Sequence, residues 1–227
     1  MNIKYAARTL AVASLIGFLA PAMSGCGSER PLWKVKSDGQ FAMNEGDYVE
    51  AVGDFSEYCE RKPGDNTVRL LLGEAYLKAG DPVKAREQLT TAYDTDPACE
   101  PCADALAKAY FDAKENERLT LFLRRLASER QRESDYLRLG IYASKLGNAD
   151  EALQALNTAA AMDKGQTVAP QLALAEFYRS VGDTTNEVRR LRMAAYIAPG
   201  NAQMLARARE LGEVVGPSFP LRPAEMP

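Results

Sequence analysis

The sequence contains no histidine among its 227 residues. Because histidine is the side chain that most often transfers protons near neutral pH, its absence excludes Ser-His and Cys-His catalysis and metal sites that need an imidazole. No other group of residues forms a recognisable catalytic constellation. We therefore expect a protein that is not an enzyme, with no cofactor and no bound metal.

The chain also lacks an excess of positive charge and a long apolar run. Its 28 Lys and Arg residues are interspersed with 31 Asp and Glu residues, for a net charge of -3, which leaves no electrostatic footprint for nucleic acid. The apolar run from Leu10 to Ala20 has 11 residues, whereas about 20 are needed to cross a bilayer as a helix. A hydrophobic content of 46% and a charged content of 26% are those of a globular protein.

The N-terminus has the order of a secretory signal. Lys4 and Arg8 make the first ten residues positive, the apolar run follows, and Pro21 ends it. The next residues, Met-Ser-Gly before Cys26, resemble the lipobox of bacterial lipoproteins, with methionine in place of the usual leucine. That resemblance implies a signal peptide over residues 1–25, a lipid on the sulfur of Cys26, and a short polar tether over 26–31.

Residue 27 is glycine rather than the aspartate that, in this family, is associated with retention at the inner membrane. We therefore expect an exported protein that is lipid-anchored to the cell envelope, at the outer membrane facing the periplasm if the cell has two membranes. A soluble secreted protein that is cut nearby is the alternative.

A period of about 34 residues runs through the rest of the chain. The positions that mark it, separated by 34, 34, 33 and 35 residues, are Gly46, Gly80, Lys114, Gly147 and Gly182. Five residues after them come Ala51, Ala85, Leu119, Ala152 and Glu187. Prolines 63, 97 and 199 end three of the units, and Gln131 and Lys164 stand at that position in the other two. Such a period predicts stacked helical pairs that share a continuous apolar core.

The stretches "LLLGEAYLKAGD" from Leu70 and "LRLGIYASKLGN" from Leu137 resemble the tetratricopeptide (TPR) repeat. The resemblance implies an all-α fold, a right-handed α-solenoid of about five helix-turn-helix repeats with a C-terminal capping helix. The repeats are expected at 32–65, 66–99, 100–132, 133–166 and 168–201, the cap at 202–216 and a Pro-rich tail at 217–227. The tail is expected to be irregular and mobile, and an extended segment that binds a partner is the alternative. In the first unit, Asp38 and Gly39 stand where an apolar pair should begin, which predicts a short or skewed first helix.

In TPR arrays the first helix of each unit lines a concave groove that binds a peptide or a helix. By that resemblance, the exposed groove positions are Leu70, Glu74, Lys78, Asp104, Lys108, Asp112, Leu137, Ile141, Lys145, Glu176 and Arg179. We expect protein or peptide partners at this surface. For each single charge, an ordinary solvated helix face is the alternative.

Three cysteines follow Cys26. Cys99 and Cys102, in "CEPC", lie at the junction between two units, and in an exported protein a disulfide that closes this turn is expected. A redox-active pair is the alternative, although such motifs normally accompany alternating strands and helices. A zinc site would need more ligands than the cysteines supply. Cys59 could instead pair with either member, and the sequence does not decide this.

Taken together, these features are similar to those of small TPR lipoproteins that act in pilus assembly. They predict a non-catalytic, lipid-anchored scaffold that binds partner proteins and aids assembly of an envelope complex such as a pilus or secretion system. The alternatives are a thiol-disulfide redox protein and a purely structural envelope protein. The sequence decides neither the partner nor the oligomeric state.

Overall fold

The computed structural model describes residues 29–227, which contain eleven α-helices and no strand. The helices are α1 (Leu32–Glu45), α2 (Tyr48–Arg61), α3 (Asn66–Lys78), α4 (Pro82–Thr95), α5 (Glu100–Asp112), α6 (Asn116–Arg130), α7 (Glu133–Lys145), α8 (Ala149–Asp163), α9 (Ala169–Ser180), α10 (Thr184–Ile197) and α11 (Ala202–Glu210). None of these helices is long and apolar enough to cross a membrane. The predicted signal peptide and the lipidation of Cys26 lie outside the described residues.

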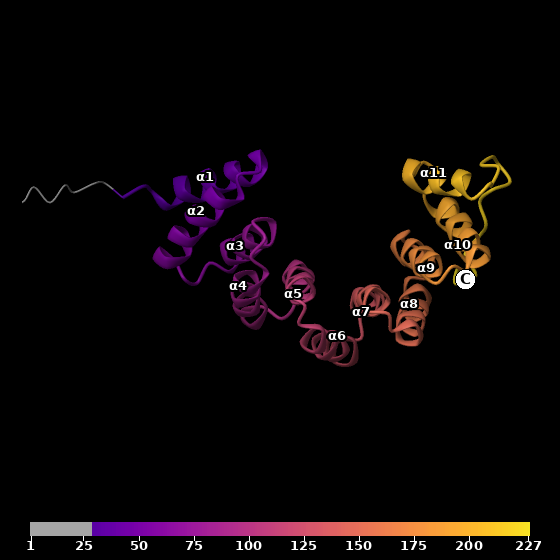
Figure 1. Ribbon diagram of the computed structural model, residues 1–227, viewed down its shortest axis with the longest axis horizontal. Helices are drawn as coiled ribbons and strands as arrows, with labels where there is room; N and C mark the ends of the chain where they lie inside the picture. The colour runs from indigo at the N-terminus through magenta and orange to yellow at the C-terminus, as the bar shows by residue number, and fades with distance from the viewer. Residues whose placement is uncertain (1–28) are drawn as a thin grey trace, which may run out of the picture. The chain divides into compact units, whose positions relative to one another are not determined.

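Helices α1 to α10 form five consecutive pairs, and each pair packs on the next (Figure 1). The buried apolar side chains form a succession of clusters: one over α1 to α3, one over α4 to α8, one over α7 to α9, and one that joins α9 and α10 to α11. No single closed core collects all helices of residues 29–227. The prediction of an all-α solenoid is therefore confirmed, because stacking rather than enclosure removes the apolar faces from water.

The turns inside the pairs explain the most regular positions of the sequence. Gly80 adopts a φ of +81°, a left-handed conformation that glycine reaches without strain. Asp81 then caps α4, since its side chain accepts a hydrogen bond from the backbone N–H of Lys84, and Pro82 occupies the first turn. Lys114, at the glycine position of the third unit, adopts the same conformation with a φ of +59°. The sequence period of about 34 residues is thus the distance along the chain between the turns that end the first helices of successive pairs.

The helices of each pair approach closely at a small residue. An added Cβ on Gly73 of α3 would lie 2.4 Å from Leu89 Cγ of α4, and one on Gly140 would lie 2.6 Å from the equivalent atom of Leu156. Gly39 plays the same part in α1, where its Cβ would lie 2.8 Å from the ring of Phe55. The prediction of a short first helix is wrong, because α1 has 14 residues and Gly39 is its contact point.

The C-terminal end differs from the prediction in two respects. Helix α11 ends at Glu210 rather than 216, because the chain turns at Gly212 with a φ of +84°. The tail is irregular, as predicted, but it is packed rather than mobile. Phe219 is 3% exposed, and its carbonyl accepts a hydrogen bond from Arg192 Nε of α10 at 2.8 Å. The backbone N–H of Leu221 donates to the carbonyl of Arg192 at 2.9 Å.

Candidate functional site

A groove runs along the first helices of the pairs. One hollow, of about 820 Å³, lies over α3, α5 and α7 and contains seven of the predicted positions, Glu74, Lys78, Asp104, Lys108, Leu137, Ile141 and Lys145. A second hollow, of about 620 Å³, lies between α7, α9 and α11. Both hollows are lined by Leu137, Ile141 and Lys145. The second also contains the predicted positions Glu176 and Arg179. The groove is therefore continuous in its lining from α3 to α11.

Two predicted groove residues line neither hollow. Leu70 is partly buried and packs against the apolar cluster that begins at α4. Asp112 is exposed, and its carboxylate accepts a hydrogen bond from Lys108 Nζ one turn earlier on α5. Both residues belong to first helices, but they point beside the hollows rather than into them.

The walls of the larger hollow combine apolar side chains with charged side chains of both signs. Leu77, Leu137 and Ile141 supply aliphatic surface, and Lys78 and Lys145 stand exposed beside them. The ammonium of Lys145 lies 5.0 Å from the ring centroid of Tyr142 and 5.5 Å from that of Phe111. A surface of this kind can pack the apolar side of a peptide and bind carboxylates at its edge.

This hollow is bordered by a charge cluster, which we define as Glu100, Asp104, Arg130, Asp135 and Arg138. Asp135 and Arg138 are buried, whereas the side chain of Asp104 is 66% exposed. Arg138 is 5% exposed, and its guanidinium donates to Asp104 at 2.6 Å, Glu100 at 2.9 Å and Asp135 at 2.9 Å. Asp135 is 0% exposed and also lies 3.2 Å from Arg130 Nε. Buried charges such as Asp135 and Arg138 need partners of opposite charge. The cluster therefore fixes α7 and the end of α6 against the start of α5.

Two groups in this hollow have shifted pKa values. Burial raises the pKa of Glu74 above its ordinary value, and the nearby Lys78 partly opposes the shift. Burial, followed by repulsion from Asp112 and Asp104, raises the pKa of Tyr142 to about 12. The phenol of Tyr142 is thus a permanent hydrogen-bond donor near neutral pH, and a cationic group of a partner would stabilise the Glu74 carboxylate.

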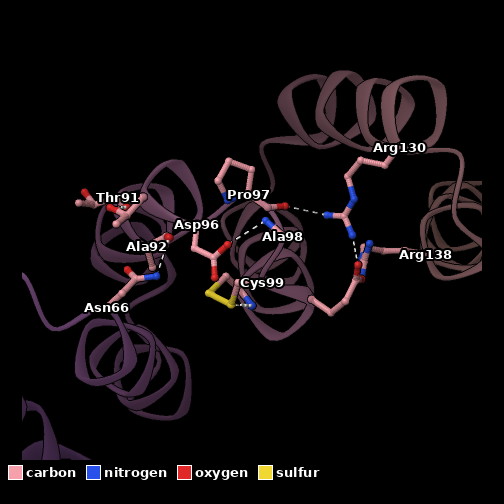
Figure 2. Close-up of a disulfide and its surroundings, with 12 residues drawn as sticks. Asn66, Thr91, Ala92, Asp96, Pro97, Ala98, Cys99, Arg130 and Arg138 are labelled. Atoms are coloured by element: carbon pink, nitrogen blue, oxygen red, sulfur yellow. Dashed lines mark hydrogen bonds and ion pairs between the residues drawn. A yellow bond between two sulfur atoms is a disulfide. The ribbon is translucent and has the colours of Figure 1, made fainter.

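The structure has a disulfide between Cys99 and Cys102 at the start of α5 (Figure 2). Cys99 is the N-cap of this helix, and its sulfur accepts a hydrogen bond from the backbone N–H of Cys102 at 3.1 Å. The two cysteines flank Glu100 of the charge cluster. Nearby, Arg130 donates to the carbonyl of Pro97 at 3.1 Å, in the turn that leads into the disulfide (Figure 2).

Cys59 is a free, buried thiol on α2. Burial raises its pKa, which keeps the thiol protonated and unreactive. Neither pairing that the sequence left open for Cys59 occurs in the structure. Within residues 29–227, no group of three Cys, Asp or Glu side chains is arranged to hold a metal ion.

Residues 42–109 match the family model of the tetratricopeptide repeat. The chain contains tetratricopeptide repeats. Its fold is similar to that of a TPR protein from Thermus thermophilus, at 21% identity over 80% of this chain and 98% of that one, with a TM-score of 0.62. A TPR protein from Parabacteroides merdae follows at 15% identity, 79% and 72% coverage and a TM-score of 0.59.

The protein MamA is also similar, at 19% identity over 82% of this chain and 98% of that one, with a TM-score of 0.55. At these identities the likeness concerns the TPR fold alone. No curated protein matches the sequence. TPR units bind protein segments in general, so the likeness agrees with a groove that takes a protein partner.

The charge cluster was not predicted from the sequence, although a signal for its buried members, Asp135 and Arg138, exists. Arg138 stands at a TPR frame position that holds Ala105 and Ala173 in the units on either side. Asp135 stands at a position that holds Val68 and Cys102, which are both buried. A charge at a buried position of the repeat predicts an ion pair, because an isolated buried charge is strongly destabilising.

Proposed function

We propose that this protein is a non-catalytic TPR scaffold that holds a segment of a partner protein in the groove over α3, α5, α7 and α9. The observation that supports this proposal is the 820 Å³ hollow, with aliphatic walls and exposed lysines beside the ion-paired Arg138. The ion pairs of Arg138 join α5 and α7 before a partner arrives, so binding needs little further ordering of the groove.

The partner that fits this groove is an amphipathic segment. Its apolar side would pack on Leu77, Leu137 and Ile141, and its acidic side chains would reach Lys78 and Lys145. Such recognition uses a few apolar anchors for affinity and the flanking charges for orientation.

The place of action in this proposal is the cell envelope, with Cys26 as the lipid anchor and the solenoid facing the periplasm. There the scaffold would aid assembly of a multi-protein structure such as a pilus or secretion system. The lipobox and the signal sequence support the anchor. The disulfide supports an oxidising compartment, since such bonds rarely persist in the cytosol.

A pull-down from membrane extracts tests the groove. The bait carries Lys78→Glu, Lys108→Glu and Lys145→Glu together, and we expect it to lose the partners that the wild-type chain captures. The control bait carries the same number of charge reversals on second helices and the cap, Arg125→Glu, Arg189→Glu and Arg209→Glu, all at exposed positions. This control should keep the partners. An unchanged partner set with the groove variant would refute the groove as the binding site.

A redox assay separates the scaffold from the redox alternative. The purified chain should fail to catalyse insulin reduction, because Cys102 is buried and the disulfide caps a helix of the solenoid. Insulin reduction that disappears in a Cys99→Ala variant would establish the alternative.

A further inference from the structure

The first helix presents two aromatic rings to solvent. Trp33 is 71% exposed and Phe41 is 67% exposed. Val35, Gly39 and Ala42 are buried against α2, and the helical period places the two rings on the opposite side of α1. We call Trp33 and Phe41 the aromatic edge. Other large apolar side chains of residues 29–227 are exposed as well, but these two are the aromatic side chains with the largest exposed fractions. Two such rings on one side of a helix are a candidate contact site.

The repeat explains why Phe41 is uncovered. Its frame position holds Ala75, Ala109 and Phe177 in three of the later units, and all three are buried. Ala75 and Phe177 lie in apolar clusters that include helices of the preceding unit. Helix α1 is the first helix of the described range, so no preceding unit covers Phe41 there.

Trp33 does not serve the packing of the repeat. The same frame position holds Thr67, Pro101, Ser134 and Ala169, none of which is a large apolar side chain. An indole at this place therefore adds apolar surface beyond what a stacked helical pair needs. Its exposure argues for an external ligand.

We propose that the aromatic edge inserts into the headgroup region of the lipid bilayer. The inference rests on the lipid anchoring of Cys26 proposed above. Cys26 precedes Trp33 by seven residues, and at about 3.4 Å per residue the intervening chain spans no more than about 24 Å. An anchored chain thus keeps α1 beside the bilayer surface. Tryptophan favours this interface, because its ring is apolar and its N–H still finds a polar partner there.

Charge next to the edge agrees with a lipid ligand. Lys34 and Lys36 belong to the same turns of α1 as Trp33, and both can approach anionic headgroups. Lys34 is held by Asp38 at 2.9 Å in an exposed pair, which a lipid phosphate could replace at little cost.

The area of the edge disfavours a second copy of the chain as its ligand. Two aromatic side chains of this exposure offer about 300 Å² of surface. A stable protein interface buries about 800 Å² on each partner. The remaining exposed residues of this face are Lys34, Ser37, Gln40 and Asn44, which are polar. Partial insertion of two rings into a bilayer needs no such area, since the lipid anchor already supplies the attachment.

The experiment uses Trp33 itself, which is the sole tryptophan of the chain. The full lipidated chain is reconstituted into vesicles of phosphatidylethanolamine and phosphatidylglycerol, with normal or brominated acyl chains. We expect lipid brominated on the acyl carbons nearest the headgroup to lower the emission of Trp33 by about half, with a shift to shorter wavelength. Bromine quenches an indole only at short range, and tryptophan favours this interface. A Phe41→Ser variant should be quenched less.

A control moves the indole to the other end of the array. The double variant Trp33→Phe, Tyr196→Trp places the only tryptophan on α10, at a position that is also exposed. Its emission should not respond to brominated lipid. Equal quenching in both proteins would overturn the inference, as would a vesicle-bound wild-type chain whose Trp33 is not quenched. A wavelength shift that grows with protein concentration without vesicles would overturn it in favour of a second copy.

The anchor is tested separately, by sedimentation of a Cys26→Ser chain with the same vesicles. Loss of sedimentation supports the anchor of the proposed function, and retention refutes it. The quenching of Trp33 in vesicle-bound chains tests the insertion of the aromatic edge whichever result the anchor test gives. Failure of the anchor and failure of the insertion are therefore distinguishable.

Discussion

Replacing Gly73 by alanine tests whether the small residues of the first helices set the spacing of the pairs. In an open helix this change stabilises by about 1 kcal/mol, because alanine loses less backbone entropy than glycine. In α3, however, the new Cβ would lie 2.4 Å from Cγ and 2.5 Å from Cδ2 of Leu89. Favourable carbon contacts need about 3.5–4.0 Å. Leu89 is fully buried and has no space to retreat.

Relief of that overlap must move α3 away from α4 or force Leu89 off its rotamer, which costs about 1–3 kcal/mol. The steric term exceeds the entropic gain, so we expect Gly73→Ala to lower the free energy of unfolding by about 1–2 kcal/mol. Denaturation in guanidinium chloride, followed by circular dichroism, measures it. The matched control is Gly53→Ala in α2, where a Cβ meets no atom within 4 Å.

The control should gain about 0.5–1 kcal/mol, since only the entropic term remains. The two variants carry the same chemical change and should therefore differ in sign. Equal stabilisation of both would refute the view that helix spacing depends on Gly73, because it would mean that α3 and α4 adjust freely.

Three further outcomes are expected. Lys114→Gly should raise the free energy of unfolding by about 0.5–1 kcal/mol, whereas Gly80→Ala should lower it by about 1 kcal/mol, because both positions have a left-handed backbone. Arg138→Met should lower it by about 3 kcal/mol, since the fully buried carboxylate of Asp135 loses a partner. Arg179→Met, in an exposed pair, should change it by less than about 0.5 kcal/mol in the same denaturation assay. Glu225 of the tail has a lowered pKa, because hydrogen bonds from the arginine it contacts on α10 outweigh the effect of burial. Its stabilising contribution is present at neutral pH and is lost as the pH falls through the folded-state pKa, so limited proteolysis should cut the tail faster in acid, and Glu225→Gln should remove this dependence.

The turn positions carried most of the information on the fold. Where the sequence has Gly80 and Asp81, the local chemistry of a left-handed turn and an N-cap indicates the end of one helix and the start of the next without any tertiary contact. The same frame still located the turn at Lys114, which lacks glycine, because the neighbouring units set the period. Gly39 was misread, since its role depends on Phe55, 16 residues later, and not on its own neighbours.

Contacts between distant segments were less accessible. The predicted groove positions came from the resemblance to TPR arrays. The charge cluster beside them joins residues from three helices, and the contacts between those helices could not be predicted from the sequence. The tail is a second example of contacts between distant segments that the sequence did not predict. Its prolines predict irregular structure, but whether an irregular segment is packed or mobile depends on the residues that it contacts elsewhere in the fold. Here Arg192 supplies those partners through its side chain and its carbonyl.

The last unit of the array is covered by other segments and the first is not, within residues 29–227. Single residues at repeat-defined positions show this difference. At the C-terminus, Glu187 occupies a frame position that is alanine in three other units, and it is buried. Its carboxylate is acceptable there only because Arg207 of α11 donates to it at 2.7 Å and 3.2 Å. The last unit is therefore built to receive a cap. At the first unit, Phe41 is apolar and exposed at an equally repeat-defined position. A helix and a tail cover the last unit, whereas nothing within residues 29–227 covers the aromatic edge of the first, and a lipid ligand accounts for that difference.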